Sequence, residues 1–127
     1  MSGWVDYDFA VVCVVPHVHL YGSSAVGVVL HARQAEFIDA RVTTDPTQLA
    51  ARIGGGDATR LSRYLESYRA VARGEVGSPL ALLPPSERFH WLTAPRSDLI
   101  QCSPVHSGRS QDPATTLEAL FRQYVPR

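Results

Sequence analysis

Cysteine is scarce in this sequence, which holds two, Cys13 and Cys102, far apart along the chain. No Cys-x-x-Cys pair and no cysteine–histidine group with zinc-ligand spacing occurs, so a metal site of that kind is not predicted. Each cysteine lies in an apolar, strand-like run, where a free cysteine usually serves as a small buried hydrophobe. No disulfide is required either, since a chain of this length buries roughly two-thirds of its unfolded surface.

The sequence also lacks net charge and long apolar runs. Twelve basic residues balance twelve acidic ones, so no global attraction to nucleic acid or to an anionic membrane is predicted. No apolar run approaches the length of a membrane span, and the first residues, MSGWVDYDF, lack the cationic and apolar segments of a secretory signal. We expect one domain over residues 1–127, in the reducing cytoplasm.

Motifs for nucleotides and for nucleophilic catalysis are missing as well. The glycines at 54–56 follow no predicted strand, and they lack the lysine of a P-loop and the spacing of a dinucleotide fingerprint. No serine lies in a nucleophile-elbow motif. We therefore predict no cofactor, and an enzyme is the less favoured class of protein.

Valine-rich runs predict three successive strands. Residues 7–15 are apolar on both faces, which is typical of a central strand covered on both sides. A second run covers 26–32, and residues 36–42 alternate between apolar and polar, which indicates one solvated face. The short connections favour an antiparallel meander.

Helical spacing begins after the third strand. Asp45 and Pro46 are an N-cap and a first helical residue, and the glycines at 54–56 end this short helix. The strongest helical pattern covers 57–74, and an Asp-Pro start at Asp112 opens a last helix. The apolar stripes are Leu61, Tyr64, Leu65, Tyr68 and Val71 in the long helix, and Leu117, Leu120, Phe121, Tyr124 and Val125 in the last.

Residues 88–93 and 98–102 are two further β-rich runs, and we predict that they pair as a hairpin across the APRS turn. In that hairpin Phe89 and Trp91 share one face and anchor the strand in the core. The element order is then β-β-β-α-α-β-β-α. This order predicts an α+β fold in which helices pack on an antiparallel or mixed sheet.

The segment from Pro84 to Ser97 groups polar residues around the two aromatic ones. If it is a strand, Arg88 and His90 share its second face, with Gln101 as a neighbour. Arginine suits a carboxylate or a phosphate, and histidine can act as an acid or a base near neutral pH. The alternative is a solvated strand face. The candidate ligand-binding residues are Glu87, Arg88, His90, Trp91, Arg96, Ser97, Gln101 and His106.

A second polar feature is the pair His17 and His19. The two imidazoles share one face if the segment is extended, which suits a transition metal. No carboxylate or thiolate follows at ligand spacing, so we expect solvated loop histidines and no metal.

The blocks YDFAVVCVVP, VGVVL, LLPPSERFHWLTAPRS and IQCSPVHSG resemble the bacterial domain-of-unknown-function 3037 family over nearly the whole chain. The resemblance implies no established activity. Members are often encoded beside a kinase of the HipA-like toxin family, which implies a kinase partner. Before VGVVL the family commonly has an acidic residue and an asparagine, where this chain has HVHLYGSSA. The matching positions are Glu87, Arg88, Phe89, His90, Trp91, Pro95, Arg96, Ser97, Gln101, Pro104, His106 and Gly108.

Three hypotheses about function follow. The first is a non-enzymatic binding or regulatory module for a protein partner, such as the HipA-like kinase, or for a small anionic ligand. The second is an enzyme acting on phosphoesters or nucleotides, in which His90 and His106 converge as acid and base. The third is nucleic-acid binding by arginines of the long helix, which more simply form its solvated face. These arginines are Arg60, Arg63, Arg69 and Arg73.

Overall fold

The strands of the fold are β1 (Val5–Val14), β2 (Ser24–Ala32), β3 (Phe37–Val42), β4 (Ile100–Cys102) and β5 (His106–Ser110). Its α-helices are α1 (Pro46–Ile53), α2 (Ala58–Arg73), α3 (Pro85–Thr93) and α4 (Pro113–Tyr124), and two short helical turns are η1 (Arg33–Ala35) and η2 (Pro79–Leu82). This computed structural model describes residues 3–14, 24–53, 58–75, 77, 79–94 and 100–125.

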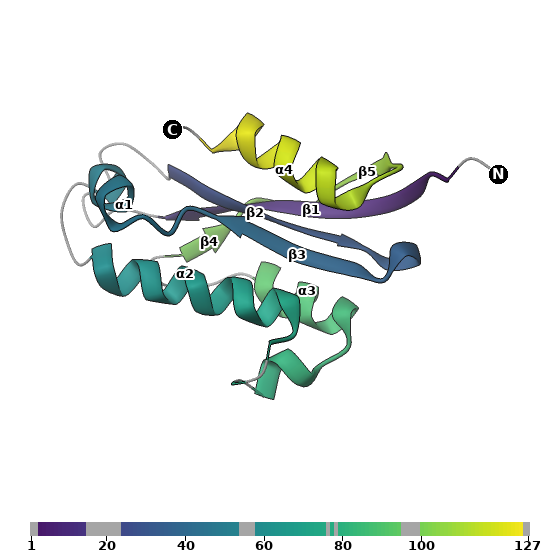
Figure 1. Cartoon of the computed structure of the whole chain (residues 1–127), viewed down its shortest axis with the longest axis horizontal. Helices are drawn as coiled ribbons and strands as arrows, with labels where there is room; N and C mark the ends of the chain where they lie inside the picture. The colour runs from purple at the N-terminus through teal and green to yellow at the C-terminus, as the bar shows by residue number, and fades with distance from the viewer. Residues whose placement is uncertain are drawn as a thin grey trace.

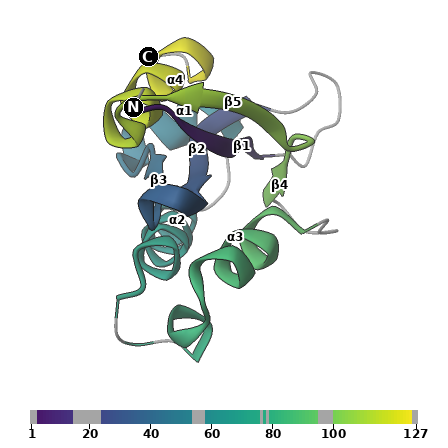
Figure 2. The same cartoon turned by 90° about the vertical axis from the view of Figure 1, so that its right-hand side faces the viewer.

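The strands form one antiparallel sheet between two helical layers (Figure 1). Helix α4 lies on one face, and α2 and α3 lie on the other (Figure 2). The architecture confirms the predicted α+β fold, and the first three strands form the predicted meander. In the described part of the chain, no helix is long and apolar enough to span a membrane.

Strand β1 is the centre of the sheet. One of its edges pairs with β2, and its other edge is divided between β4 and β5. Ser103 bridges the gap between these two short strands, because its N–H donates to the Val11 carbonyl at 2.8 Å and its Oγ accepts from the Val11 N–H at 2.9 Å. The backbone groups of Val11 are therefore satisfied where the ladder changes partner.

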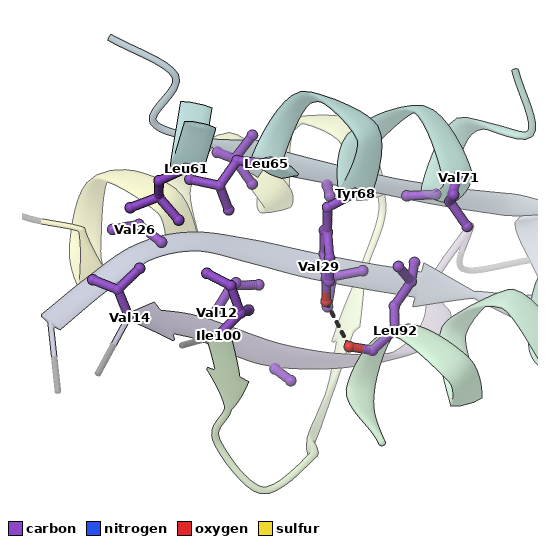
Figure 3. Close-up of a cluster of buried hydrophobic side chains, with 14 of the residues drawn as sticks. Val12, Val14, Val26, Val29, Leu61, Leu65, Tyr68, Val71, Leu92 and Ile100 are labelled. Carbon is purple, nitrogen blue, oxygen red and sulfur yellow. Dashed lines mark hydrogen bonds between the residues drawn. The ribbon is translucent and has the colours of Figure 1, made fainter. Parts of the chain in front are cut away.

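Both faces of β1 are covered by helices, as the sequence predicts. Ala10, Val12 and Val14 pack with apolar residues of α2 and α3 (Figure 3), and Phe9 and Val11 pack toward α4. A strand with two apolar faces is stable in water only when both are buried. The two helical layers follow from this pattern.

The predicted helix ends are confirmed where the structure describes them. Asp45 Oδ1 accepts from the Thr47 N–H at 2.9 Å, and Asp112 Oδ1 accepts from the Thr115 N–H at 3.4 Å. Gly74 takes a φ of 71° at the end of α2, a left-handed conformation that glycine adopts without a steric cost.

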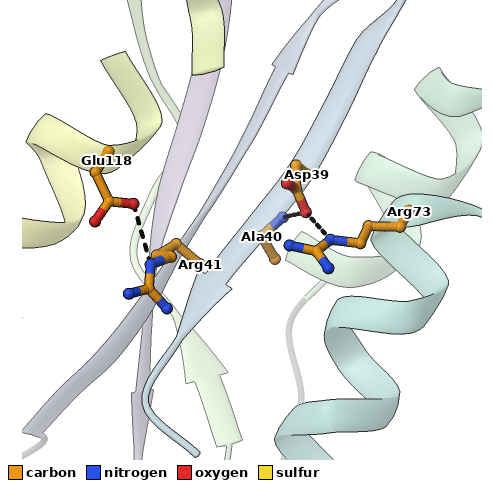
Figure 4. A network of polar contacts seen from close by, with 5 residues as sticks. All are labelled: Asp39, Ala40, Arg41, Arg73 and Glu118. Carbon is orange, nitrogen blue, oxygen red and sulfur yellow. Dashed lines mark hydrogen bonds and ion pairs between the residues drawn. The ribbon is translucent and has the colours of Figure 1, made fainter. Parts of the chain in front are cut away.

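Strand β3 lies at one edge of the sheet, and ion pairs tie it to the helices on both sides (Figure 4). Arg73 of α2 contacts Asp39 at 2.8 Å, and Arg41 contacts Glu118 of α4 at 3.0 Å. Solvent-exposed pairs of this kind contribute about 0–1 kcal/mol each. Charges on an edge strand also discourage pairing with other chains.

The predicted hairpin of residues 88–93 and 98–102 is wrong. Residues 88–93 belong to α3, and β4 pairs with β1. Pro85 stands in the first turn of α3, where a missing N–H costs nothing, and the buried Phe89 and Leu92 follow helical spacing. The second strand of the last pair is β5, so the order is β-β-β-α-α-α-β-β-α.

The environment of the two cysteines also differs from the expectation. Cys13 and Cys102 are free and half-buried. The Cys102 thiol lies 3.3 Å from the Leu92 carbonyl and 3.5 Å from the Tyr68 hydroxyl, so this cysteine has polar neighbours as well as apolar ones.

Alanine at position 27 tests the close approach of β2 and β3. A Cβ on Gly27 would lie 2.7 Å from Val42 Cγ1 and 2.8 Å from the Arg41 carbonyl oxygen. Because the backbone of β3 cannot move away cheaply, Gly27→Ala should lower the free energy of unfolding by about 1–3 kcal/mol, measured in urea. Gly108→Ala is the control, since its Cβ would meet the outer end of the Tyr7 ring. Equal costs for the two variants would contradict this account.

Candidate functional site

Helix α3 divides the predicted site segment among three environments. Phe89 and Leu92 are buried in the core. Ser86, His90 and Thr93 line a cleft at one side of the helix, while Trp91 lines a groove at another. The spacing of 86, 90 and 93 places those three side chains on one helical face. Within residues 84–94, which the structure describes, the polar side chains therefore do not form one surface.

The cleft, called the polar cleft below, has a volume of about 490 Å³ and lies between α3, the first half of β1, the end of β2 and η1. Two acidic residues, Asp6 and Asp8, and the basic Arg33 line it, so the lining includes residues of both charges. Its lining residues are Asp6, Asp8, His31, Arg33, Gln34, Ser86, Phe89, His90, Thr93 and Val105.

His31 lines the inner part of the polar cleft. It is 8% exposed, and its ring centroid lies 5.6 Å from that of Phe89. Burial lowers the pKa of His31 below its ordinary value of 6.5; Asp8 has the next largest effect and opposes this shift, while Arg33 and Arg88 lower the pKa further. The imidazole is therefore neutral at pH 7, with one donor and one acceptor nitrogen.

Asp8 lies beside His31 through the register of the sheet. Asp8 is paired with His31 on β2 and with Ser107 on β5, so the three side chains share one face. The Ser107 hydroxyl donates to Asp8 Oδ1 at 2.6 Å. This bond orients the carboxylate next to the buried imidazole.

The groove on the other side of α3, called the aromatic groove below, is mainly apolar and also measures about 490 Å³. Its floor is fixed by the Tyr68 hydroxyl, which donates to the Leu92 carbonyl at 2.8 Å (Figure 3). Trp91 and Tyr64 line it and are substantially exposed. Its lining residues are Tyr64, Ser67, Tyr68, Ala70, Val71, Glu75, Gly77, Leu80, Trp91 and Leu92.

Arg88 contacts neighbouring protein groups. Its Nη1 donates to the Leu83 carbonyl at 2.6 Å, and its guanidinium lies against Gly74 at the end of α2. Its Nε is buried and has no hydrogen-bond partner among the described residues. Arg88 thus connects the end of α2 to the start of α3.

The other predicted site residues are scattered. Glu87 is exposed in the first turn of α3, and Gln101 is exposed on β4, opposite Cys13. His106 is exposed on β5, with its ring centroid 5.5 Å from that of Phe9. Arg96, Ser97, His17 and His19 lie outside the described residues.

The structure does not bring His90 and His106 together. His106 is paired with Phe9, whose side chain packs on the α4 face of the sheet. His90 lies on α3, against the opposite face. The acid–base pair of the phosphoester hypothesis is therefore not assembled in this structure.

The residues that sequence reasoning missed are Asp8, His31 and Arg33. The available signal was a polar residue inside an otherwise apolar strand, such as His31 in VGVVLHA. Among the described residues, no three histidine, cysteine or acidic side chains are grouped in a way that could hold a metal ion.

Comparison with known proteins gives the class of protein first. The chain is an α+β protein of a family described as proteins of unknown function. It belongs to the DUF3037 family, whose model matches residues 9–125, and this confirms the resemblance seen in the sequence. Neither the curated proteins nor the solved structures contain a match.

Truncations on α3 test its orientation. Phe89→Ala should cost about 3–5 kcal/mol of stability, because it leaves a cavity in the core. Trp91→Ala should cost about 1 kcal/mol or less, since half of this side chain is already in solvent. The predicted hairpin anchored Trp91 in the core, where its truncation would cost as much stability as that of Phe89. The position of Trp91 on α3 does not support that large loss. Urea unfolding of the two variants measures the difference, and equal losses would contradict the helical orientation.

The buried His31 also predicts a pH dependence of stability. Because its pKa is lower in the folded than in the unfolded chain, the unfolded state binds more protons just below pH 6.5. The free energy of unfolding should therefore be highest above pH 6.5 and fall as the pH drops through the window between the two pKa values. His31→Gln should flatten the curve in that window. An unchanged slope in this variant would exclude His31 as the cause.

Proposed function

We propose that this protein is a non-enzymatic binding module that holds a protein partner in the aromatic groove between α2 and α3. The observation that carries the proposal is the exposure of Trp91 and Tyr64 in a mainly apolar hollow. Tryptophan and tyrosine are the side chains most often found at the energetic centre of protein interfaces.

The surroundings of the groove support a protein ligand. Leu82, the most exposed of the large hydrophobic residues described, lies on η2, which also contributes Leu80 to the groove. Ser67 and Glu75 add polar groups to its lining. An apolar centre with polar groups is the usual composition of a partner-binding surface.

The proposed occupant is a segment of a partner protein that inserts an apolar anchor side chain between α2 and α3. The partner suggested by the sequence resemblance, a HipA-like kinase, is the first candidate, and a regulatory role would follow from binding it. The anionic-ligand version is less favoured, because Arg88 donates to Leu83. The cytoplasmic location stays a prediction.

Trp91→Ala tests this proposal with Trp4→Ala as a matched control. The two tryptophans are 48% and 47% exposed, so both variants remove a similar exposed surface. With a purified HipA-like kinase as the partner, Trp91→Ala should weaken binding by about 30-fold or more, the usual effect of losing a hot-spot aromatic. Trp4→Ala should bind as the unmodified protein does. Calorimetry measures both affinities.

Fluorescence gives a second measurement of the same contact. The chain contains two tryptophans, so Trp4→Phe leaves Trp91 as the single emitter. Its emission should shift to shorter wavelength when the partner excludes water from the groove. A partner that binds tightly without moving this emission, or that binds Trp91→Ala unchanged, would place the interface elsewhere and refute the proposal.

A further inference from the structure

The polar cleft is separate from the aromatic groove, and its lining has the features of a binding site of its own. His31 carries the argument because it is 8% exposed, lines the cleft, and makes no hydrogen bond with any described residue. A nearly buried imidazole usually has a hydrogen-bond partner, since leaving one of its nitrogens unsatisfied costs free energy. Its ring nitrogens are not among the buried atoms without a partner, so they are open to the cleft, where water or a bound ligand supplies the hydrogen bond.

Asp8 supplies a negative charge beside this imidazole. Its Oδ1 is engaged by the Ser107 hydroxyl, but its Oδ2 accepts no hydrogen bond from a described residue. A carboxylate oxygen beside a neutral histidine, which offers one acceptor nitrogen, is complementary to a primary ammonium group, which has three N–H donors. Asp6 is less available, since it lies 3.4 Å from Arg109 in an exposed ion pair.

The other residues that line the cleft offer contacts for a negatively charged group and for an apolar group of a small ligand. Arg33 is exposed in η1, where its guanidinium can pair with a carboxylate. Phe89 and Val105 add apolar surface to the same cleft. The volume of about 490 Å³ lies in the range of small-molecule sites.

We propose that the polar cleft binds a small zwitterion, a free amino acid with an apolar side chain. Its ammonium donates to Asp8 Oδ2 and to the acceptor nitrogen of His31. Its carboxylate pairs with Arg33, and its side chain packs against Phe89 and Val105. Both charges of the ligand are then matched by charges of the cleft, which neither a simple anion nor a simple amine achieves.

The test uses three probes that share the leucine side chain and differ in their charged groups: L-leucine, L-leucinamide, which lacks the carboxylate, and N-acetyl-L-leucine, which lacks the ammonium. Proton–carbon NMR spectra of the imidazole rings at pH 7.5 follow binding, and the His31 signal is assigned by its loss in His31→Gln. L-leucine should shift the His31 signal in a saturable way. Each of the other probes should bind about tenfold or more weakly, as expected when one charge-assisted pair is lost.

Asp8→Asn is the second test of the proposal. This variant keeps the size of the side chain and an oxygen that accepts the Ser107 hydrogen bond, and it removes only the negative charge. L-leucine binding, followed by the His31 signal, should weaken about tenfold or more. His106→Gln is the matched control on the other face of the sheet and should leave binding unchanged. Trp91→Ala should leave it unchanged as well, which separates this site from the aromatic groove.

Saturable shifts with L-leucinamide as strong as those with L-leucine would overturn the zwitterion in favour of a simple amine. Binding of N-acetyl-L-leucine at least as tight as that of L-leucine would overturn it in favour of an anion. No His31 shift with any probe, or full binding by Asp8→Asn, would refute the site assigned here.

Discussion

The fold depends on burying both faces of β1. This strand is apolar on each side, so it is stable only with helices above and below, and α4 together with α2 and α3 supplies them. The same arrangement separates the polar residues of the protein into two groups. Side chains that share the face of Phe9, such as His106, cannot meet side chains that share the face of Ala10, such as His31.

The first three strands could be predicted from their valine-rich or alternating sequences, and α1, α2 and α4 from their helical period; two of these helices also begin at an Asp-Pro pair. Residues 88–93 fit two periods. Phe89 and Trp91 alternate as in a strand and have β-favouring side chains, while Pro85 and the spacing of Phe89 and Leu92 fit a helix. Strand β5 has a polar sequence, and only its pairing with β1 makes it a strand.

The site was harder to predict than the fold, because it depends on register. Nothing in the sequence places Asp8 opposite His31, and a shift of one residue would move each to the other face. Figure 1 shows the first half of β1 extending past the end of α2, so the sheet is less covered there. Asp8 and His31 interrupt the apolar strands at the place where the polar cleft lies. Unpaired polar side chains of this kind would be costly in a fully buried core.

The sequence predicts a ligand-binding role for Arg88, but in the structure this residue helps to hold α3, the helix that contributes to both proposed sites. Its Nη1 donates to the Leu83 carbonyl just before α3, its guanidinium lies against Gly74 at the end of α2, and its Nε is buried without a hydrogen bond among the described residues, which costs about 1–3 kcal/mol. At the other end of α3, the Tyr68 hydroxyl binds the Leu92 carbonyl. Two polar contacts at opposite ends fix the rotation of α3 about its own axis. That rotation directs His90 into the polar cleft and Trp91 into the aromatic groove, so both proposed sites depend on it.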